Sequence, residues 1–302
     1  MIQSMNHFEA VIGYPREDIR WLMGSGDTLR YSYNKRKSAT KTRKISPSLL
    51  ELKDIQNRLK DRVFSNVTFP WHIVGSTKKR DGVLNARLHS GLLHHFKTDV
   101  SSFFDYVTYR DVNVALLGLG FSKQIAESIT KLVTYKGHVP QGASTSAFIA
   151  NLVGLKIDKK IVEICSGRDI IYTRYVDDML FSSHTNFQDF TPVILEALHS
   201  LGFKHNDRKT YYKLGDVEVT GAITGCNGLK PTRATSEKYM WATSEAVMAG
   251  CEGYFKYVSR VNDMSVVEYK ERYAELQFPE KIIIRPKVRD IAPTLASGPT
   301  TR

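Results

Sequence analysis

Two adjacent aspartates, Asp177 and Asp178, stand between two strongly β-prone runs at residues 170–173 and 179–182. Such runs on either side of a short turn predict a β-hairpin, which would expose both carboxylates at its tip. Hard cations such as Mg2+ prefer carboxylate oxygens, and two-metal phosphoryl transfer clamps the attacking and leaving oxygens of an in-line displacement. Because Asp-Asp is also a common turn dipeptide, the pair alone leaves a plain turn and a nucleotide-polymerising site equally open.

The charge of the chain favours a polyanionic partner. Its 302 residues include 43 Lys and Arg against 31 Asp and Glu, a formal net charge of +12. Basic side chains neutralise phosphates and release counterions, so nucleic acid is the favoured class of ligand. The apolar runs near residues 114–121 and 147–155 are short and interrupted, and residues 1–7 lack a signal-peptide pattern. We therefore expect a cytoplasmic protein without a membrane partner.

The three cysteines argue against two common structural devices. Cys165, Cys226 and Cys251 are odd in number and far apart, so they fit neither a disulfide framework nor a zinc site. We expect buried free thiols.

Helical periodicity covers much of the chain. Apolar residues recur at helical spacing in residues 46–63, 122–135, 144–165 and 193–201. In the first of these segments, Ser48 followed by Glu51 forms a possible capping box. From about Thr232 the pattern is wholly helical, with aromatic side chains interleaved with lysine and arginine. We expect these aromatic side chains, Tyr239, Trp241, Tyr254, Phe255 and Tyr257, to be mostly core.

Two further segments are predicted to be extended. Residues 94–100 form a strand-like run in which Asp99 is followed closely by the aromatic pair Phe103-Phe104. Residues 35–44 form a turn with basic flanks, which predicts a hairpin whose arms carry cations. A charge run is more often a solvated face, and only the charge of the expected ligand favours a binding role here. Strands alternating with helices in this order predict an α+β fold with antiparallel strands.

Four elements follow one another along the chain: Asp99 with Phe103-Phe104, then Pro140-Gln141-Gly142, then Tyr175-Val176-Asp177-Asp178, then Asn206 to Lys209-Thr210. This ordered series resembles the motifs of reverse transcriptases. Two more elements resemble those of bacterial retron reverse transcriptases, namely Asn-Ala-x-x-His at residues 85–89 and Val-Thr-Gly at residues 219–221. The resemblance covers roughly residues 28–240. It departs at Val176, where the best-studied retron enzymes often carry alanine.

The resemblance implies a right-hand polymerase fold with fingers, palm and a helical thumb. Residues 1–95 would form N-terminal helices and fingers, and residues 96–231 would form the catalytic palm with some finger elements. Residues 232–302 would form a helical thumb and an RNA-binding C-terminal region.

The resemblance also implies roles for individual residues. Asp99, Asp177 and Asp178, with the carbonyl of Val100, would hold two Mg2+ ions, and all three acids would be catalytic. Tyr175 and Val176 would lie against primer and template. The nucleotide would be bound by Lys41, Arg43, Phe104, Gln141, Gly142 and Lys209, with Phe104 as a steric gate against ribonucleotides and Phe103 in the core. RNA recognition would involve Asn85, Ala86, His89, Val219, Thr220 and Gly221.

A retron enzyme uses a cognate structured non-coding RNA as both template and primer. Synthesis from deoxynucleoside triphosphates begins at the 2′-hydroxyl of a guanosine and gives branched, RNA-linked single-stranded DNA, called msDNA. The resemblance further implies a neighbouring effector or toxin protein and a role in defence against phage. Two alternatives stay open at this point: another bacterial reverse transcriptase, either defence-associated or intron-like, and a nucleic-acid-binding scaffold whose polymerase motifs are vestigial.

Overall fold

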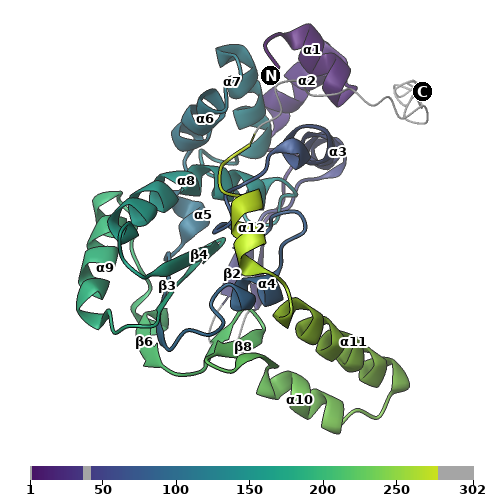
Figure 1. The fold of residues 1–302 in the computed structure, drawn as a ribbon. Coiled ribbons are helices and arrows are strands. Elements are labelled where there is room, and N and C mark those ends of the chain that lie inside the picture. The colour runs from purple at the N-terminus through teal and green to yellow at the C-terminus, as the bar shows by residue number, and fades with distance from the viewer. Residues whose placement is uncertain (1, 37–41, 278–302) are drawn as a thin grey trace.

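A four-stranded antiparallel sheet lies at the centre of the computed structural model, which describes residues 2–36 and 42–277 (Figure 1). The strand order is β4-β5-β3-β6. In the register, Asp99 lies opposite Asp178, and Tyr175 also lies opposite Asp178 across the hairpin, so the predicted Asp-Asp hairpin is confirmed. The strands are β3 (His94–Asp99), β4 (Ile171–Tyr175), β5 (Asp178–Ser183) and β6 (Tyr211–Leu214).

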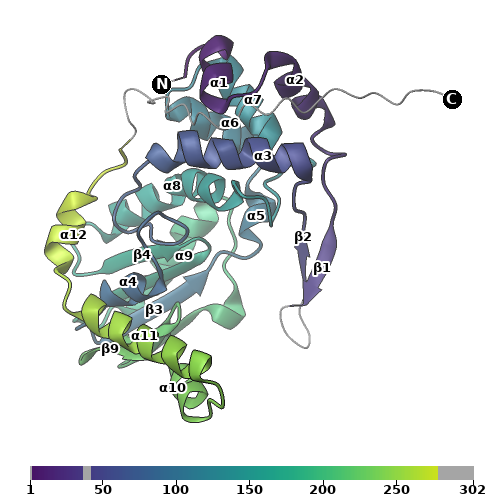
Figure 2. The same cartoon turned by 90° about the vertical axis from the view of Figure 1, so that its right-hand side faces the viewer.

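Two smaller antiparallel sheets flank the central one. Strands β1 (Tyr33–Arg36) and β2 (Thr42–Ile45) form the predicted basic hairpin, which projects away from the helices (Figure 2). Lys41 lies outside the described residues. Strands β7 (Val217–Val219), β8 (Ala222–Gly225) and β9 (Gly228–Pro231) form a meander that the sequence did not predict.

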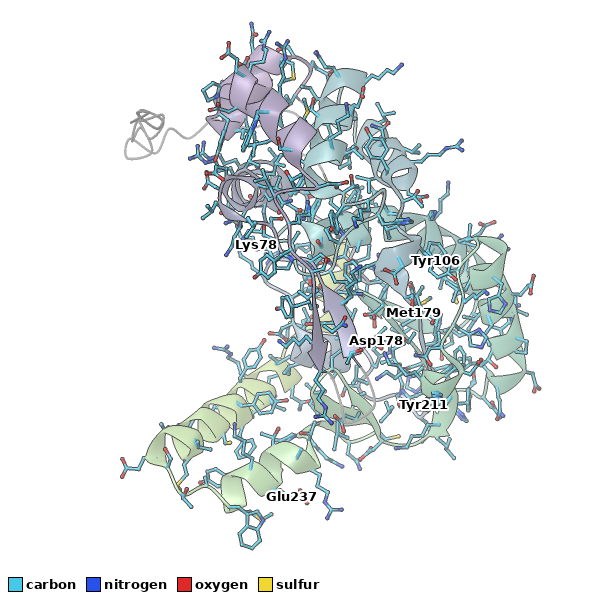
Figure 3. All side chains as sticks on the ribbon, turned by 180° about the vertical axis from the view of Figure 1, so that it is seen from behind. Lys78, Tyr106, Asp178, Met179, Tyr211 and Glu237 are labelled. Atoms are coloured by element: carbon cyan, nitrogen blue, oxygen red, sulfur yellow. The ribbon has the colours of Figure 1, made fainter. Side chains whose placement is uncertain are left out.

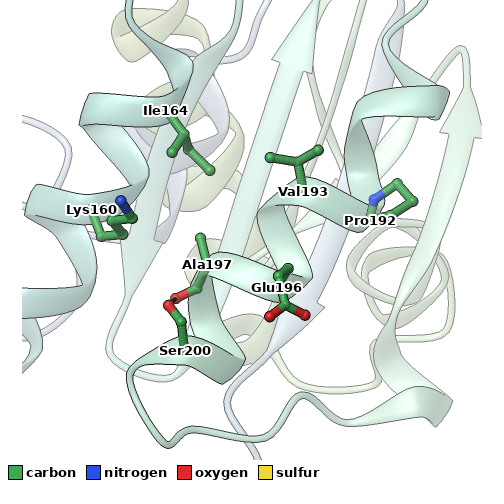
Figure 4. Close-up of a pocket in the computed structure, with 7 residues that line it drawn as sticks. All are labelled: Lys160, Ile164, Pro192, Val193, Glu196, Ala197 and Ser200. Atoms are coloured by element: carbon green, nitrogen blue, oxygen red, sulfur yellow. Dashed lines mark hydrogen bonds between the residues drawn. The ribbon is translucent and has the colours of Figure 1, made fainter.

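Helices α8 (Ser146–Cys165) and α9 (Thr191–Ser200) pack beside the central sheet and confirm two predicted segments. Helix α7 (Lys123–Val133) confirms a third, with the Ser122 hydroxyl accepting a hydrogen bond from the Ile125 amide. An apolar groove between α8 and α9 is drawn in Figure 4. Its lining residues are Lys160, Ile164, Pro192, Val193, Glu196, Ala197 and Ser200.

The N-terminal helices form a layer with α6 and α7 at one end of the molecule (Figures 1 and 2). These helices are α1 (Met5–Ile12), α2 (Arg16–Ser25) and α3 (Leu50–Arg58), and α3 continues as a π-helical turn (Leu59–Val63) and a 3-10 turn (Phe64–Asn66). Helix α6 spans Tyr109–Gly118. The predicted apolar stripe Leu52, Ile55, Leu59 and Val63 is buried.

The predicted capping box is wrong. Helix α3 begins at Leu50 and has no side-chain cap. The Ser48 hydroxyl instead donates to Gln56 Oε1 at 2.7 Å and accepts from the Arg30 guanidinium at 2.8 Å. The Ser48 hydroxyl thus bonds buried Arg30 and buried Gln56 instead of a backbone amide at the start of the helix.

The C-terminal part of the described chain is helical, as predicted. It comprises α10 (Arg233–Met240), α11 (Glu245–Asn262) and α12 (Val266–Arg272), and the α10–α11 pair projects from the body (Figure 1). The expectation of an aromatic core fails at Trp241, which is 79% exposed because it follows the end of α10 at the tip of this pair. Tyr239, Tyr254, Phe255 and Tyr257 are partly buried.

The remaining short elements connect the larger ones. Helix α4 spans Gly82–Arg87 and α5 spans Phe103–Tyr106, and 3-10 turns span Gln188–Phe190 and Asp207–Lys209. Cys165 and Cys251 are buried free thiols as expected, whereas Cys226 is exposed because it lies in the tight β8–β9 turn, so the expectation is wrong there. Across the described ranges, no helix combines the length and apolar character that crossing a membrane requires.

Candidate active site

The three predicted acids converge at one end of the central sheet. Asp99 ends β3, Asp178 begins β5 beside it, and Asp177 lies in the β4–β5 turn, with ligand oxygens of all three within 4.8 Å of one another. The Val100 amide donates to the Asp177 carbonyl at 2.9 Å and ties the two strand ends together. In Figure 3 the labelled Asp178 lies in the middle of the molecule.

The hairpin turn has an unusual backbone. Val176 adopts a left-handed φ of 61°. A β-branched side chain rarely adopts this conformation, which costs on the order of 1–3 kcal/mol and persists only where the surroundings fix it. The strained residue directly precedes Asp177. Strained backbone of this kind is often found at functional sites.

The acids influence one another electrostatically. Burial, together with the charges of Asp99 and Asp178, raises the pKa of Asp177. Burial is also the largest cause of the raised pKa of Asp178, and it outweighs the opposing charge of Lys209. The Lys209 ammonium lies 2.6 Å from Asp99 Oδ1 and 3.6 Å from Asp178 Oδ1. Burial alone would lower the pKa of Lys209, but the hydrogen bond to Asp99 and the acidic charges raise it, so the amine stays protonated.

A cleft of about 550 Å³ connects the acids to the basic hairpin. That volume lies within the range of small-molecule sites. The cleft brings together Arg43, Phe104, Gln141 and Lys209 from the predicted nucleotide set, and the acids Asp99 and Asp177. Its other lining residues are Thr42, Lys44, Val100, Ser101, Ser102, Phe103, Asp105 and Asn206.

The turn at Gln141-Gly142 anchors the hairpin to the palm side of the cleft. The Ser46 amide, just after β2, donates to the Gln141 carbonyl at 2.7 Å. Gly142 has a φ of 105°, and a Cβ there would lie 2.6 Å from Ile45 Cγ2. Only glycine tolerates both conditions, so this position lets the hairpin approach. Gly142 itself is not among the residues that line the cleft.

The two neighbouring phenylalanines have different environments. Phe103 is 2% exposed and packs in the main core, as expected, and it is also among the residues that line the cleft. Phe104 is partly exposed and lines the cleft beside Asp99. The adjacent Ser102 has a left-handed φ of 50°, which turns the chain sharply after β3.

The two retron-like elements meet each other away from the acids. Asn85, Ala86 and His89 are buried, and the Thr220 hydroxyl donates to the Gly82 carbonyl at 2.8 Å. Asn85 accepts from the Thr173 hydroxyl at 2.7 Å, and its amide group lies 3.4 Å from Thr220 Oγ1. None of these side chains, nor those of Val219, Tyr175 and Val176, is among the lining of the cleft.

His89 is enclosed by polar partners. Its Nε2 lies 2.8 Å from Thr173 Oγ1, and its Nδ1 lies 2.8 Å from Ser182 Oγ. Burial holds the pKa of His89 well below its ordinary value, so the ring is neutral. A neutral, fully hydrogen-bonded histidine of this kind ties α4 to β4 and β5.

Sequence reasoning missed several groups that shape the site. Asn206 donates to Asp99 Oδ2 at 3.3 Å and to the Asp99 carbonyl through its backbone amide at 2.9 Å. The sequence predicts Asn206 only as the start of a motif. Arg174, wholly buried within β4, was missed as well, although a charged residue inside an otherwise uncharged strand was a usable signal.

The donor set fits a divalent metal ion. Three carboxylates with ligand oxygens this close repel one another unless a cation lies between them, and carboxylate oxygens are the ligands that hard divalent ions prefer. Asp99, Asp177 and Asp178 are therefore the residues that could hold such an ion.

Comparison with known proteins agrees with this geometry. Residues 34–240 match the family model described as reverse transcriptase (RNA-dependent DNA polymerase). The retron Se72 reverse transcriptase of Salmonella heidelberg is 27% identical over 187 residues, covering 60% of this chain and 48% of that protein. The retron Ec86 reverse transcriptase of Escherichia coli is 29% identical over 185 residues, covering 60% and 57%. The chain thus spans about half the length of the curated relatives it matches.

Among solved structures, apo telomerase from Candida tropicalis, truncated from its C-terminal domain, is similar with a TM-score of 0.49 at 14% identity. The alignment covers 71% of this chain and 59% of that one. This similarity is too weak to carry the assignment, which rests on the family match over more than half of the chain. The match, together with the antiparallel palm sheet and its helices, confirms the predicted α+β polymerase fold. The chain belongs to the reverse transcriptase (RNA-dependent DNA polymerase) family and resembles its retron members.

Proposed function

We propose that this chain is a retron-type reverse transcriptase that copies a structured RNA into DNA. One observation carries the proposal: three carboxylates within 4.8 Å of one another line or adjoin a cleft that Arg43 and Lys44 of the basic hairpin also line. Acids that bind metal, facing cations that bind triphosphate, are what nucleotidyl transfer requires.

Four side chains that line the cleft have a proposed task in nucleotide binding. Arg43 binds the triphosphate of an incoming deoxynucleotide, because a guanidinium can make bidentate contacts with phosphate. Phe104 crowds the 2′ position of the sugar, and Gln141 contacts the nucleotide. Lys209, kept protonated by its acidic neighbours, supplies a proton to the departing pyrophosphate. Lys41, Tyr175, Val176 and Gly142 keep their predicted roles beside nucleotide, primer and template.

The metal proposed for this site is Mg2+, in two ions. Asp99, Asp177, Asp178 and the Val100 carbonyl would hold them. When bound, they lower the pKa of the primer hydroxyl and offset charge on the departing pyrophosphate.

The proposed division of labour follows the architecture. We assign residues 1–95 to N-terminal helices and fingers, residues 96–231 to the palm, and residues 232–302 to the thumb and RNA-binding region. The β1–β2 hairpin, the central sheet and α10–α12 support this assignment within the described residues.

The retron elements are proposed to support RNA recognition indirectly, as buried residues that hold neighbouring segments in place. Buried Asn85, Ala86 and His89 fix α4 against the sheet, and the turn at Val219-Thr220-Gly221 packs on the start of α4. Tyr254 of α11 donates to the Gly221 carbonyl, which links this turn to the thumb. The partners proposed are a cognate non-coding RNA, its msDNA product primed from a guanosine 2′-hydroxyl, and a neighbouring effector in antiphage defence. Similarity to retron reverse transcriptases supports an RNA partner.

The test is to express the chain with several hundred bases of its upstream genomic DNA and purify it. The bound nucleic acid is then run before and after RNase and debranching-enzyme treatment. A small DNA whose mobility shifts on debranching is the expected result, and the Asp177→Asn/Asp178→Asn variant should carry none. Extension of a supplied primer on RNA without bound DNA would favour another bacterial reverse transcriptase. A protein that carries no DNA and extends no primer would favour the nucleic-acid-binding scaffold.

A further inference from the structure

Arg174 is the largest side chain that is fully buried in the described chain. It lies on β4, three residues before Asp177, and pairs with Asp158 of α8. Nε donates to Asp158 Oδ1 at 2.8 Å, and Nη2 donates to Asp158 Oδ2 at 2.6 Å. The Tyr172 hydroxyl donates to the same Asp158 Oδ1 at 2.8 Å. The ion pair is therefore bidentate and has a third supporting hydrogen bond.

The remaining N–H groups of Arg174 point toward the hairpin turn and α8. Nη1 donates to the Val176 carbonyl at 2.9 Å and to Asn151 Oδ1 at 3.0 Å. Nη2 also donates to the Asn151 carbonyl at 3.2 Å. A guanidinium has five N–H groups, and all five are used.

The sequence makes room for this arrangement. A Cβ at Gly154 would lie 2.8 Å from Arg174 Cζ, so α8 carries a glycine where the guanidinium crosses it. Helix interiors disfavour glycine relative to alanine, so the close approach of the guanidinium explains why this position is glycine.

A second segment, residues 72–75, also contacts the turn. The Arg174 amide donates to the His72 carbonyl at 2.7 Å, and the Val74 amide donates to the Arg174 carbonyl at 2.9 Å. A Cβ at Gly75 would lie 2.6 Å from the Val176 nitrogen, and Asn151 Nδ2 donates to the Gly75 carbonyl at 2.7 Å. The turn is thus enclosed between Arg174 and residues 72–75.

These contacts surround the one strained residue of the turn. A valine in the left-handed conformation persists only where the surrounding contacts fix its backbone. One such contact is the hydrogen bond that the Arg174 guanidinium donates to the Val176 carbonyl. Asp177 follows that carbonyl directly, so any relaxation of Val176 would move the Asp177 carboxylate relative to Asp99.

We propose that Arg174, held by Asp158 and Asn151, is a positioning residue: it fixes the Val176 peptide and so sets the Asp177 and Asp178 carboxylates in the arrangement that binds metal. This inference rests on the proposed polymerase function and deepens it. Arg174 acts through the turn and does not touch nucleotide. Partners of this kind, one step removed from the ligands, change metal affinity or activity by roughly 10–100-fold when they are altered.

The test separates positioning from folding by removing the buried charges together. A single Arg174→Gln change would leave Asp158 buried and unpaired, which is strongly destabilising, whereas apolar replacement of a whole buried pair is often neutral. The informative protein is therefore the triple variant Tyr172→Phe/Asp158→Leu/Arg174→Met, which keeps the volume and removes the donor to Val176. Tyr172→Phe alone is the matched control, since it loses a hydrogen bond to Asp158 and keeps that donor.

Two readouts are measured on each protein: Mn2+ binding without nucleic acid, from the electron paramagnetic resonance signal of free Mn2+, and steady-state primer extension. We expect the control to match the wild type in both. The triple variant should fold but melt at a lower temperature than the wild type, because the Val176 carbonyl and Asn151 Oδ1 lose a buried donor. It should bind Mn2+ about tenfold more weakly. Its kcat should fall about tenfold or more with the KM for nucleotide within about twofold.

Wild-type Mn2+ affinity and kcat in a folded triple variant would overturn the proposal and leave Arg174 a purely structural residue. If the triple variant does not fold, Arg174→Lys is used instead: it keeps a charge for Asp158 but cannot supply five donors, and the same loss is expected. A wild type that binds Mn2+ but extends no primer refutes the polymerase function, and the Mn2+ comparison still decides the role of Arg174. A wild type that binds no Mn2+ overturns both.

Discussion

At the scale of single residues, the acid cluster that could bind a metal ion lowers the stability of the fold. The folded protein holds three neighbouring carboxylates close together, with the Lys209 ammonium as the cation nearest to them among the ion pairs of the described chain. Because burial and like charges raise the pKa of Asp177 and of Asp178, the native state binds protons more tightly there than the unfolded chain does. Ionising these two acids therefore costs stability.

We predict the pH dependence of that cost. For an acid whose folded pKa is raised, the stability contribution falls as pH rises from its unfolded pKa of about 4 through its folded pKa. In metal-free buffer, Asp177→Asn/Asp178→Asn should therefore gain free energy of unfolding relative to the wild type as pH rises from 3 to 7. Urea titrations at each pH measure this difference, and a difference independent of pH would contradict it. Added Mg2+ should stabilise the wild type alone.

Phe104 is predicted to govern the choice of sugar. It lines the cleft beside Asp99, where removal of its ring would leave space near the 2′ position. Phe104→Ala should raise incorporation of ribonucleotides relative to deoxynucleotides by roughly tenfold or more. A small change in the fit between a substrate and an apolar pocket can change discrimination between substrates by about 1–3 kcal/mol. Competitive primer extension measures the ratio. Phe103→Leu, in the core, should cost about 1 kcal/mol of stability and leave the ratio unchanged.

Arg43 is predicted to bind the triphosphate. It is exposed on β2 and lines the cleft. Arg43→Ala should raise the KM for nucleotide by roughly tenfold, because a charge-assisted hydrogen bond contributes about 1.5–3 kcal/mol. Lys35→Ala removes one positive charge from the same hairpin at a position that does not line the cleft, and it should leave the KM nearly unchanged. Equal effects of the two changes would assign both to general electrostatics.

At the scale of elements, local pattern predicted what local forces determine. The apolar stripe of Leu52, Ile55 and Leu59 predicted a helix because side chains at these spacings share one face. The β7–β9 meander escaped prediction because its strands have three or four residues, too few for a periodic pattern. The capping box predicted at Ser48 is wrong because the competing partner of Ser48, Arg30, is brought to it only by tertiary packing.

The same distinction applies to the site. The convergence of Asp99 with Asp177 and Asp178 was predictable because adjacent antiparallel strands bring such residues together. The pairing of Arg174 with Asp158 was not, because it depends on how α8 lies across β4. The burial of Asn85 and His89 also depends on packing between elements remote in sequence.

His89 is predicted to make the α4–sheet junction sensitive to acid. Its pKa is held well below 6.5 in the fold, so below about pH 6.5 the unfolded chain takes up a proton that the native state refuses. Stability should then fall as pH drops from 7 to 5, by up to about 1.4 kcal/mol per pH unit from this group. His89→Gln should cost about 1–3 kcal/mol at pH 7 and reduce that pH slope.

Urea titrations at pH 7, 6 and 5 measure the slope. His184→Gln is the matched control, because His184 is exposed at the end of β5 and lies outside the buried network. The same slope in the wild type and in His89→Gln would show that other groups govern the acid response.

At the scale of the whole molecule, exposed basic side chains lie both on the β1–β2 hairpin and on α11. The β1–β2 hairpin exposes Lys35, Arg36, Arg43 and Lys44, and α11 exposes Lys256 and Arg260. The chain has a formal net charge of +12, and three of its 31 acidic residues meet at the cluster. An RNA lying across hairpin and thumb would contact about six of these groups, which makes its binding largely electrostatic.

This arrangement predicts a strong dependence of RNA binding on salt. About six phosphate contacts imply a loss in affinity of roughly a thousandfold between 50 and 200 mM salt. Lys35→Ala/Lys44→Ala should reduce the slope of log K against log salt by roughly 1–2, because two contacts are removed. Filter binding to a structured RNA in metal-free buffer measures the slope. Lys123→Ala/Lys159→Ala removes the same charge from exposed positions on α7 and α8, and should keep the wild-type slope. If both double variants lowered it equally, the RNA would be responding to net charge and not to a path between hairpin and thumb.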